Sequence, residues 1–531
     1  MQNASPSLLD RFFAKRTLAA AYTEERALFL ARLMEESRRG HLCWKPDGEA
    51  PAFPSSIVAG GESLCPKTPV VLDGGRYYLQ RNWVYESYLL SQVDRLRVSE
   101  PAPFYDKKLF EKELSNCEAL QPEQRIAIAS AFENPFSIIC GGPGTGKTYT
   151  AALLVRLLLA SVKKEKRKSF KLILSASTGK AASHLQSVLL GQGNLGSFVK
   201  TETTTLHRLL KLQPGENRLF QKRRIDADFV LIDEASMLDA PLLAHLFESI
   251  GNGTRLVLLG DPDQLPPVES GSLFPEMASL FGSHLKRSMR VEASDLQQFA
   301  KAILESGSEE MERLLKVPSP SLEHLNWPFD AALQEKLFKM ADPFISNEKP
   351  DPEKSISQLN RFRILGSLRQ GPYGVDELNR QILHEAGRRV QPGQWWAVPI
   401  LITSNEPRLE LYNGSCGILI GKSSRGIHLR EGTAYFSDFE TGGVRSFSNL
   451  PPFEIAFCLS IHKSQGSEFE KVLALFPPGS EHFGREAIYT AATRAKKELR
   501  LVGDKEVLKK MIAKRSLKIS GFTERYRTPK K

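Results

Sequence analysis

Cysteine is scarce in this sequence, and the six cysteines among its 531 residues are dispersed. None forms a C-x-x-C pair, which argues against a structural zinc site or an iron–sulfur cluster and favours a reducing compartment. Long apolar runs are missing as well, because none approaches the ~18 residues that a membrane span needs. The start, Met1–Pro6, lacks the charged and apolar regions of a secretory signal. We therefore expect a cytoplasmic protein without a membrane partner.

Acidic residues are outnumbered, since 72 lysines and arginines stand against 61 aspartates and glutamates, for a net charge of +11. This excess favours a polyanionic partner such as nucleic acid, although it carries no information about the fold. A chain of this length is expected to form three or four domains. No internal repeat of fixed period is present.

The most informative segment is the run Gly-Gly-Pro-Gly-Thr-Gly-Lys-Thr at residues 141–148, which satisfies the phosphate-binding pattern G-x-x-x-x-G-K-[S/T]. The apolar run Phe136–Cys140 before it is typical of a strand, and residues 149–160 after it are typical of a helix. Backbone N–H groups of such a loop surround phosphate oxygens, the helix N-terminus adds a favourable dipole, and Lys147 adds a charge. A glycine-rich turn that carries a lysine by accident would lack this strand–loop–helix context. The pattern predicts an ATP site formed by Gly141, Gly142, Pro143, Gly144, Thr145, Gly146, Lys147 and Thr148, with the Thr148 hydroxyl on Mg²⁺.

From residue 118 to about 275, short apolar runs alternate with longer helical stretches. This alternation predicts an α/β fold with a parallel, doubly wound sheet. The expected strands are Ser137–Cys140, Lys171–Ala176, Asp228–Ile232 and Arg255–Leu259.

Two further segments supply what hydrolysis of a nucleotide needs besides the loop. Four apolar residues at 229–232 predict a buried strand that delivers Asp233 toward Mg²⁺ and places Glu234 where it can polarise water. A second buried strand ends at the turn of residues 261–268, where the neutral Gln264 suits a sensor of the γ-phosphate. A solvent-exposed Asp-Glu pair is the alternative for residues 233 and 234, and the loop upstream makes it the weaker one.

Together these segments resemble the superfamily 1 DNA helicases, and the resemblance extends to residues 120–127, 175–182, 204–210, 461–469 and 489–496. It implies that Gln124 contacts adenine. It also implies that Arg494 and Arg290 reach the γ-phosphate from a second motor domain, with Arg287 as a competing candidate for the second arginine. Contacts to the DNA backbone are implied for Thr178, Lys180, Thr205, His207, His462, Lys463 and Gln465.

Three more segments, 77–86, 368–379 and 409–417, are similar to the RecD family, the alpha subunits of exodeoxyribonuclease V (RecBCD) in superfamily 1B. The resemblance covers residues 25 to 504. It implies two RecA-like P-loop NTPase motor domains with parallel sheets, a small mixed N-terminal domain and a small β insertion in the second motor domain. The implied boundaries are 1–117 for a partner-docking domain, 118–280 for the first motor domain with a duplex-splitting pin at 211–224, and 281–531 for the second, with its β-rich insertion near 400–455.

The resemblance implies an ATP- and Mg²⁺-dependent 5′→3′ helicase that acts on a single-stranded 5′ tail and a duplex end during recombinational repair. RecB- and RecC-like subunits would complete a heterotrimer, and the nuclease would reside in one of them. A stand-alone RecD-like helicase is the alternative, although its members usually carry helix–hairpin–helix repeats that are not visible in residues 1–117. An ATP-dependent switch without unwinding, and a small-molecule kinase, fit the complete set of segments less well.

Overall fold

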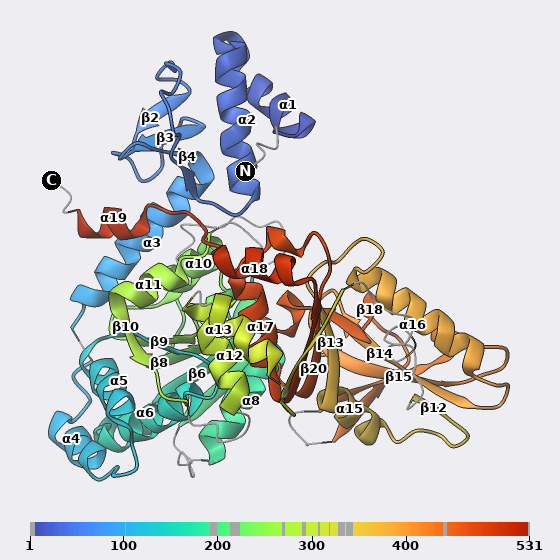
Figure 1. The fold of residues 1–531 in the computed structure, drawn as a ribbon. Helices are drawn as coiled ribbons and strands as arrows, with labels where there is room; N and C mark the ends of the chain where they lie inside the picture. The colour runs from blue at the N-terminus through green and yellow to red at the C-terminus, as the bar shows by residue number, and fades with distance from the viewer. Residues whose placement is uncertain are drawn as a thin grey trace.

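Among the residues that it describes, this computed structural model contains four β-sheets and the helices that cover them (Figure 1). Within the described part of the chain, no helix combines the length and the apolar character that crossing a membrane requires. The structure describes residues 6–528 except for residues 101, 192–198, 213–223, 268–270, 289–293, 306–307, 318, 328–334, 336–343, 407 and 439–442.

The N-terminal region contains a small mixed sheet. Its elements are α1 (Leu8–Leu18), α2 (Glu24–Arg38), β1 (Cys43–Trp44), β2 (Val58–Gly60), β3 (Val70–Asp73), β4 (Arg76–Leu79) and the long α3 (Gln80–Val98). The strand order is β1-β4-β3-β2, and only β2 and β3 pair in parallel. The first two helices begin where they do because the hydroxyls of Ser7 and Thr23 accept hydrogen bonds from N–H groups of the first turn.

The second sheet has six parallel strands in the order β10-β5-β9-β8-β6-β7. All four strands expected from the sequence are present within a residue or two of their predicted bounds. The elements in chain order are α4 (Lys107–Ser115), α5 (Pro122–Glu133), β5 (Phe136–Gly141), α6 (Lys147–Ser161), α7 (Lys164–Arg167), β6 (Lys171–Ala176), α8 (Gly179–Gly191), β7 (Lys200–Thr205), α9 (Leu206–Leu209), β8 (Phe229–Asp233), α10 (Ala240–Ser249), β9 (Arg255–Gly260), α11 (Phe274–Phe281) and β10 (Gly282–Leu285).

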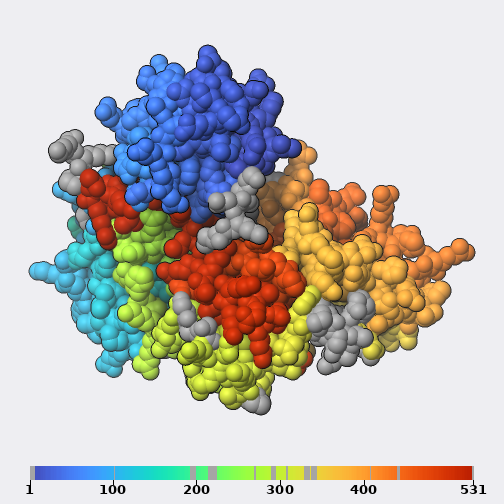
Figure 2. All heavy atoms as spheres, turned by 45° about the horizontal axis from the view of Figure 1, so that its top comes forward, coloured from blue at the N-terminus to red at the C-terminus, as the bar shows by residue number. Residues whose placement is uncertain are grey.

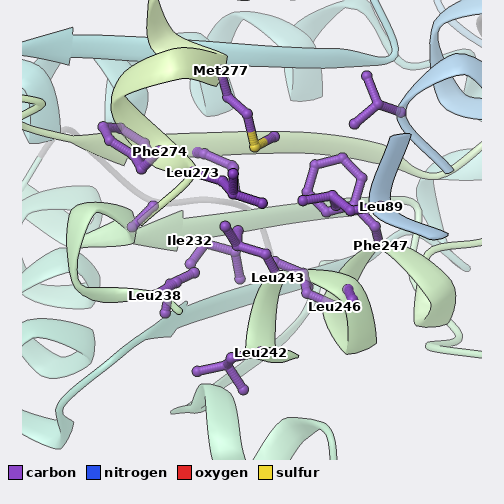
Figure 3. Close-up of a cluster of buried hydrophobic side chains, with 14 of the residues drawn as sticks. Leu89, Ile232, Leu238, Leu242, Leu243, Leu246, Phe247, Leu273, Phe274 and Met277 are labelled. Atoms are coloured by element: carbon purple, nitrogen blue, oxygen red, sulfur yellow. The ribbon is translucent and has the colours of Figure 1, made fainter. Parts of the chain in front are cut away.

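Apolar side chains cover both faces of this sheet, as near-continuous apolar strands require. One face packs under α3, α10 and α11, where Phe247, Phe274 and Met277 are buried (Figure 3). The opposite face packs against α5, α6 and α8, which contribute a separate buried cluster. The sheet is doubly wound, and two apolar cores hold the ends of its strands in place.

A third sheet, of five parallel strands, forms the centre of the second motor domain. Its elements are α12 (Ser294–Leu304), α13 (Ser308–Lys316), β11 (Leu322–Leu325), α15 (Pro352–Arg361), β13 (Phe362–Gly366), α16 (Val375–Arg389), β19 (Cys458–Ser460), β20 (Phe469–Phe476), α17 (Arg485–Arg494), β21 (Ala495–Gly503) and α18 (Lys505–Ala513). The strand order is β11-β21-β20-β13-β19.

An antiparallel sheet is inserted into this second motor domain. It contains β12 (Ile345–Ser346), β14 (Trp395–Ile402), β15 (Cys416–Lys422), β16 (Thr433–Ser437), β17 (Val444–Phe447) and β18 (Phe453–Ile455). The two parallel sheets, the mixed N-terminal sheet and this insertion confirm the predicted α/β fold class. Most of the expected pin at 211–224 lies outside the described residues.

The first motor sheet extends past residue 280, where the sequence placed the end of that domain. β10 pairs in parallel with β5, with Leu285 opposite Gly141, so the sheet ends five residues later than expected. The expected strand runs did not include residues 282–285, because this segment is short and its apolar character is weak.

The last described helix, α19 (Phe522–Arg527), leaves the second motor domain, although the sequence assigned all of 281–531 to that domain. Phe522 is buried in the apolar core that α3 and α11 share. Arg525 pairs with the fully buried Glu86 of α3 at 2.8 Å and lies 3.7 Å over the ring of Trp83. The red C-terminal segments border the blue N-terminal region in Figure 2. The C-terminal segment therefore fastens the N-terminal region to the first motor sheet.

The Glu86–Arg525 pair gives a first prediction. Arg525→Ala is expected to lower the free energy of unfolding by about 3–5 kcal/mol, because it leaves the Glu86 carboxylate buried without its cation. The midpoint of urea denaturation measures this loss. Arg527→Ala on the same helix removes an exposed arginine and serves as the control. Equal midpoints for the two variants would contradict the prediction.

Candidate active site

The phosphate-binding loop leaves β5 and enters α6 as the sequence predicted. Gly144 and Gly146 have φ values of +74° and +83°, which favour glycine at both positions. Lys147 is the first residue of α6, and its Nζ donates hydrogen bonds to the carbonyl oxygens of Gly141 (2.7 Å) and Gly142 (3.0 Å). The loop thus closes around an ammonium group beside a helix N-terminus, which is an arrangement that binds phosphate oxygens.

Two other residues shape this loop. Thr145 Oγ1 donates to the carbonyl of Gly142 at 2.8 Å, which fixes the turn. Gln124 is buried on α5 and lies against the loop, since its Nε2 is 2.9 Å from the position of a Cβ at Gly146. A side chain at residue 146 would therefore displace Gln124.

Two acidic residues stand at the end of β8. Thr148 Oγ1 lies 3.5 Å from Asp233 Oδ2, and the other oxygen of Asp233 accepts a hydrogen bond from the backbone N–H of Glu234 at 2.8 Å. Glu234 has a φ of +53°, a conformation that non-glycine residues seldom adopt and that gathers at functional sites. A hydroxyl and a carboxylate are therefore placed to share one cation, with a second carboxylate beside them.

Burial is the main influence on the pKa of both acidic residues. Burial raises the pKa of Asp233, against a lowering by its hydrogen bond from the Glu234 backbone. Burial, and next the charge of Asp233, raise the pKa of Glu234, whereas Arg494 and Lys147 lower it. A carboxylate with a raised pKa beside two cations is suited to polarise water.

The turn after β9 holds Gln264. Its Nε2 donates to Asp261 Oδ2 at 3.2 Å. Its Oε1 is buried and has no hydrogen-bond partner among the residues that the structure describes. A buried acceptor without a hydrogen bond costs free energy, so such atoms in folded proteins usually bind a water molecule or a ligand. This oxygen is available for such a bond.

The second motor domain contacts this turn through α17 and the segment before β20. The backbone N–H of Leu265 donates to Thr490 Oγ1 at 2.9 Å, and its carbonyl accepts from Gln465 Nε2 at 2.8 Å. Both partners belong to the second motor domain, so the backbone of Leu265 forms two hydrogen bonds across the domain boundary.

Arg494 is buried at the end of α17. Its guanidinium donates to the carbonyls of Thr490 (3.2 Å) and Ser467 (3.1 Å), and its charge lowers the pKa of Glu234 across the domain boundary. Arg290 lies outside the described residues. Arg287, its competitor, donates to Gln121 at 3.0 Å.

A cavity of about 450 Å³ separates the phosphate-binding loop from α12 and α17. Its volume falls within the range of small-molecule sites, roughly 300–1,000 Å³. Residues of both motor domains line it: Gly141, Gly142, Pro143 and Thr145 from the loop, the apolar Leu296, Ala300 and Leu304 from α12, and the cationic Lys286, Lys301 and Lys496.

Three of the residues expected to contact DNA are brought together at the edge of the first motor sheet. Thr178 and Lys180 follow β6, and Thr205 ends β7; a Cβ at Gly179 would lie 4.0 Å from the Thr205 methyl group. Lys180 Nζ also reaches Ser467 Oγ of the second motor domain at 3.5 Å.

The other four expected DNA contacts have different surroundings. His207 is exposed on α9, and His462 packs edge-on against Phe483. Lys463 forms an ion pair with Glu454 of the insertion. Gln465 is buried and donates to the carbonyl of Leu265, and the next residue, Gly466, lies beside Thr178, whose Oγ1 is 3.5 Å from the position of a Cβ at Gly466.

Comparison with known proteins identifies the family. A protein from Mycolicibacterium smegmatis named RecBCD enzyme subunit RecD is 32% identical over 508 residues, which cover 91% of this chain and 87% of that protein. This chain belongs to the RecD family of superfamily 1 DNA helicases. A RecD-family relative from Mycobacterium tuberculosis is 30% identical over 483 residues, 84% of this chain and 80% of that protein.

Two family models and further proteins also match this chain. A family model described as an AAA domain matches residues 124–270, and one described as a UvrD-like helicase C-terminal domain matches residues 455–502. A protein from Deinococcus radiodurans named ATP-dependent RecD2 DNA helicase is 25% identical over 89% of this chain and 58% of that protein. A solved structure of Pif1 helicase from Bacteroides covers 74% of this chain and 94% of its own at 17% identity, with a TM-score of 0.40.

The structure adds three residues to the site of this RecD-family chain that sequence reasoning missed. Asp261 directly follows β9, and Asp233 is the last residue of the neighbouring β8; this similar position at adjacent strand ends could have indicated it. Tyr489 lines the cavity from α17, and Tyr412 of the insertion accepts a hydrogen bond from Arg208 at 3.0 Å. Both tyrosines lie within segments that resemble the helicase family, but no local pattern indicates a contact across a domain boundary.

Glu234 gives the second prediction. Glu234→Gln is expected to leave ATP binding within a few-fold of wild type and to lower kcat for hydrolysis by about 10²–10⁴, because the amide cannot accept a proton from water. Steady-state ATPase kinetics and nucleotide titration measure the two effects. Glu353→Gln, an exposed change on α15, is the control, and an unchanged kcat in Glu234→Gln would contradict the assigned role.

Proposed function

We propose that this chain is the 5′→3′ helicase subunit of a multi-subunit complex that unwinds and degrades double-stranded DNA ends for recombinational repair. The cavity between the two motor domains carries the proposal, because residues of both domains line it. A nucleotide bound there contacts both domains, so its hydrolysis changes their relative position, and such changes drive domain closure in other enzymes.

Each catalytic group has a proposed role in ATP hydrolysis. Lys147 exchanges its two loop carbonyls for phosphate oxygens, and Glu234 polarises the attacking water. Gln264 senses the γ-phosphate through the second N–H of its amide, and its oxygen accepts a hydrogen bond from the attacking water. Arg494 and Arg290 neutralise developing charge from the second motor domain, a contribution of about 10³–10⁵ in rate for arginines supplied in this way. Gln124 positions the adenine.

The residues at the end of β8 fit a magnesium ion. Thr148 and Asp233 would hold it with one hydroxyl and one carboxylate, the small number of protein ligands that Mg²⁺ uses when phosphates and water complete its shell. The ion would supply charge neutralisation at the phosphate oxygens.

For DNA we propose a single strand that runs along the edge where the two motor domains meet. Thr178, Lys180 and Thr205 line this edge from the first domain, and Ser467 adjoins them from the second. His207, His462, Lys463 and Gln465 remain proposed contacts. Their hydrogen-bonding and cationic groups suit the phosphate–sugar backbone.

The N-terminal region is proposed to bind the RecB- or RecC-like subunits. On α1, the side chains of Leu8, Leu9, Phe12 and Phe13 are 87%, 58%, 54% and 49% exposed, at positions that share one side of the helix. Adjacent exposed apolar side chains of this size mark an interaction surface. In support of a cytoplasmic location, all six cysteines are free.

Unwinding assays test the main proposal. The chain, alone and with its RecB- and RecC-like subunits, is given duplexes with either a 5′ or a 3′ single-stranded tail. We expect ATP-dependent unwinding from the 5′ tail and none by Lys147→Gln. Unwinding from the 3′ tail alone by a complex whose other motors are inactivated would refute the polarity. Unwinding by the isolated chain would favour the stand-alone alternative, which the Deinococcus relative represents.

The docking surface is tested separately. The double variant Leu8→Ser, Phe12→Ser is expected to weaken binding to the partner subunits by at least about tenfold, because exposed apolar anchors dominate such interfaces. Its ATPase is expected to stay at the wild-type rate. Arg16→Ser, an exposed polar change on the same helix, is the control. Undiminished co-purification of the double variant would rule out this surface.

A further inference from the structure

Tyr489 lies on α17 of the second motor domain, and its ring is buried in that domain's core. Its hydroxyl lies outside this core and contacts the first motor domain. There it donates a hydrogen bond to Asp261 Oδ2 at 3.0 Å. It also lies 3.0 Å from the position of a Cβ at Gly142, so the glycine of the phosphate-binding loop leaves room for it. One hydroxyl thus touches two loops of the opposite domain.

Asp261 connects this hydroxyl to Gln264. The same oxygen, Oδ2, accepts from Gln264 Nε2 at 3.2 Å, and Oδ1 accepts from the backbone N–H of Asp263 at 3.1 Å. Because the amide nitrogen of Gln264 is held in this way, its unpartnered Oε1 is fixed in orientation. Asp261 is 1% exposed, so little competition from water weakens the arrangement.

The pKa of Tyr489 supports its role as the donor in this hydrogen bond. Burial, and next the charge of Asp261, raise the pKa of Tyr489 well above its usual value. The hydroxyl therefore keeps its proton throughout the neutral range and remains a donor. A hydrogen bond to a charged acceptor is about twice as strong as one between neutral groups.

We propose that Tyr489 is a positioning residue that sets the orientation of the γ-phosphate sensor Gln264 through Asp261, according to where the second motor domain stands. When α17 is seated against the first domain, the hydroxyl holds Asp261 and Asp261 holds the Gln264 amide. When α17 withdraws, Asp261 loses one of its two side-chain donors and Gln264 gains freedom. This inference rests on the proposed function, because it takes Gln264 to be the sensor.

Removal of one oxygen tests the proposal. Tyr489→Phe keeps the ring in its core and deletes the donor. We expect kcat for DNA-stimulated ATP hydrolysis, measured on the full complex with its other motors inactivated, to fall about 10- to 100-fold, as for loss of a hydrogen bond to a charged group. KM for ATP is expected to change less than threefold, because the nucleotide keeps its contacts with the loop. Tyr78→Phe, which deletes a buried hydroxyl bonded to Glu86 outside the cavity, is the matched control.

A double-mutant cycle with Asp261→Asn separates positioning from packing. If the hydroxyl acts through Asp261, the double variant is no slower than the slower single variant. Multiplying losses, or a kcat of Tyr489→Phe within twofold of wild type, would overturn the proposal. If wild-type complex itself shows no DNA-stimulated ATPase, the proposed function fails instead, and the two failures are thus distinguishable.

Discussion

The site depends on one constraint, which is that β5, β9 and β8 are adjacent parallel strands. Adjacent parallel strands end at the same edge of their sheet, and ligands bind outside those ends. Here the three ends supply the phosphate-binding loop, the Asp261–Gln264 turn and the Asp233–Glu234 pair. The apolar cores on the two faces of the sheet fix the strands and helices that flank these loops. The polar side chains on the loops are therefore held in position by the elements that carry them.

The second motor domain contributes side chains to the site that hydrogen bonds hold in place. Arg494 is bonded to carbonyls of its own domain, and its charge still reaches Glu234. Leu265 is bonded twice across the boundary. Because these contacts join rigid elements, a small displacement of α17 changes several of them together. This is the property that a motor requires, since packed interfaces shift between discrete arrangements.

The C-terminal segment adds a second connection between parts of the molecule. After α18 it passes Asp263 at Arg515 (3.8 Å) and hydrogen-bonds the N-terminal region at His41 before α19 packs against α3. The Glu86–Arg525 ion pair holds the end of this segment in place. Removal of either partner would leave the other charge buried and unpaired, which is strongly destabilising. The Asp261–Gln264 turn and the N-terminal region are therefore joined through the covalent chain as well as through packing.

The local parts of the site could be predicted from the sequence. The loop 141–148, the strand that ends at Asp233 and the turn at Gln264 are each a continuous stretch of sequence. The pattern within each stretch is sufficient to place its polar side chains on a loop or at the end of a strand. Periodicity likewise indicated the four strands of the first motor sheet. Asp261 could have been added by the same reasoning.

Which distant residues meet could not be predicted in this way, because it depends on the three-dimensional packing of whole domains. Tyr489 reaches Asp261, Arg208 reaches Tyr412, β10 joins the first sheet, and α19 returns to α3. Each contact joins segments whose separation along the chain carries no signal, because it arises from how whole domains pack. Local patterns specify what a segment can do chemically, whereas the packing of apolar faces specifies where that chemistry is used.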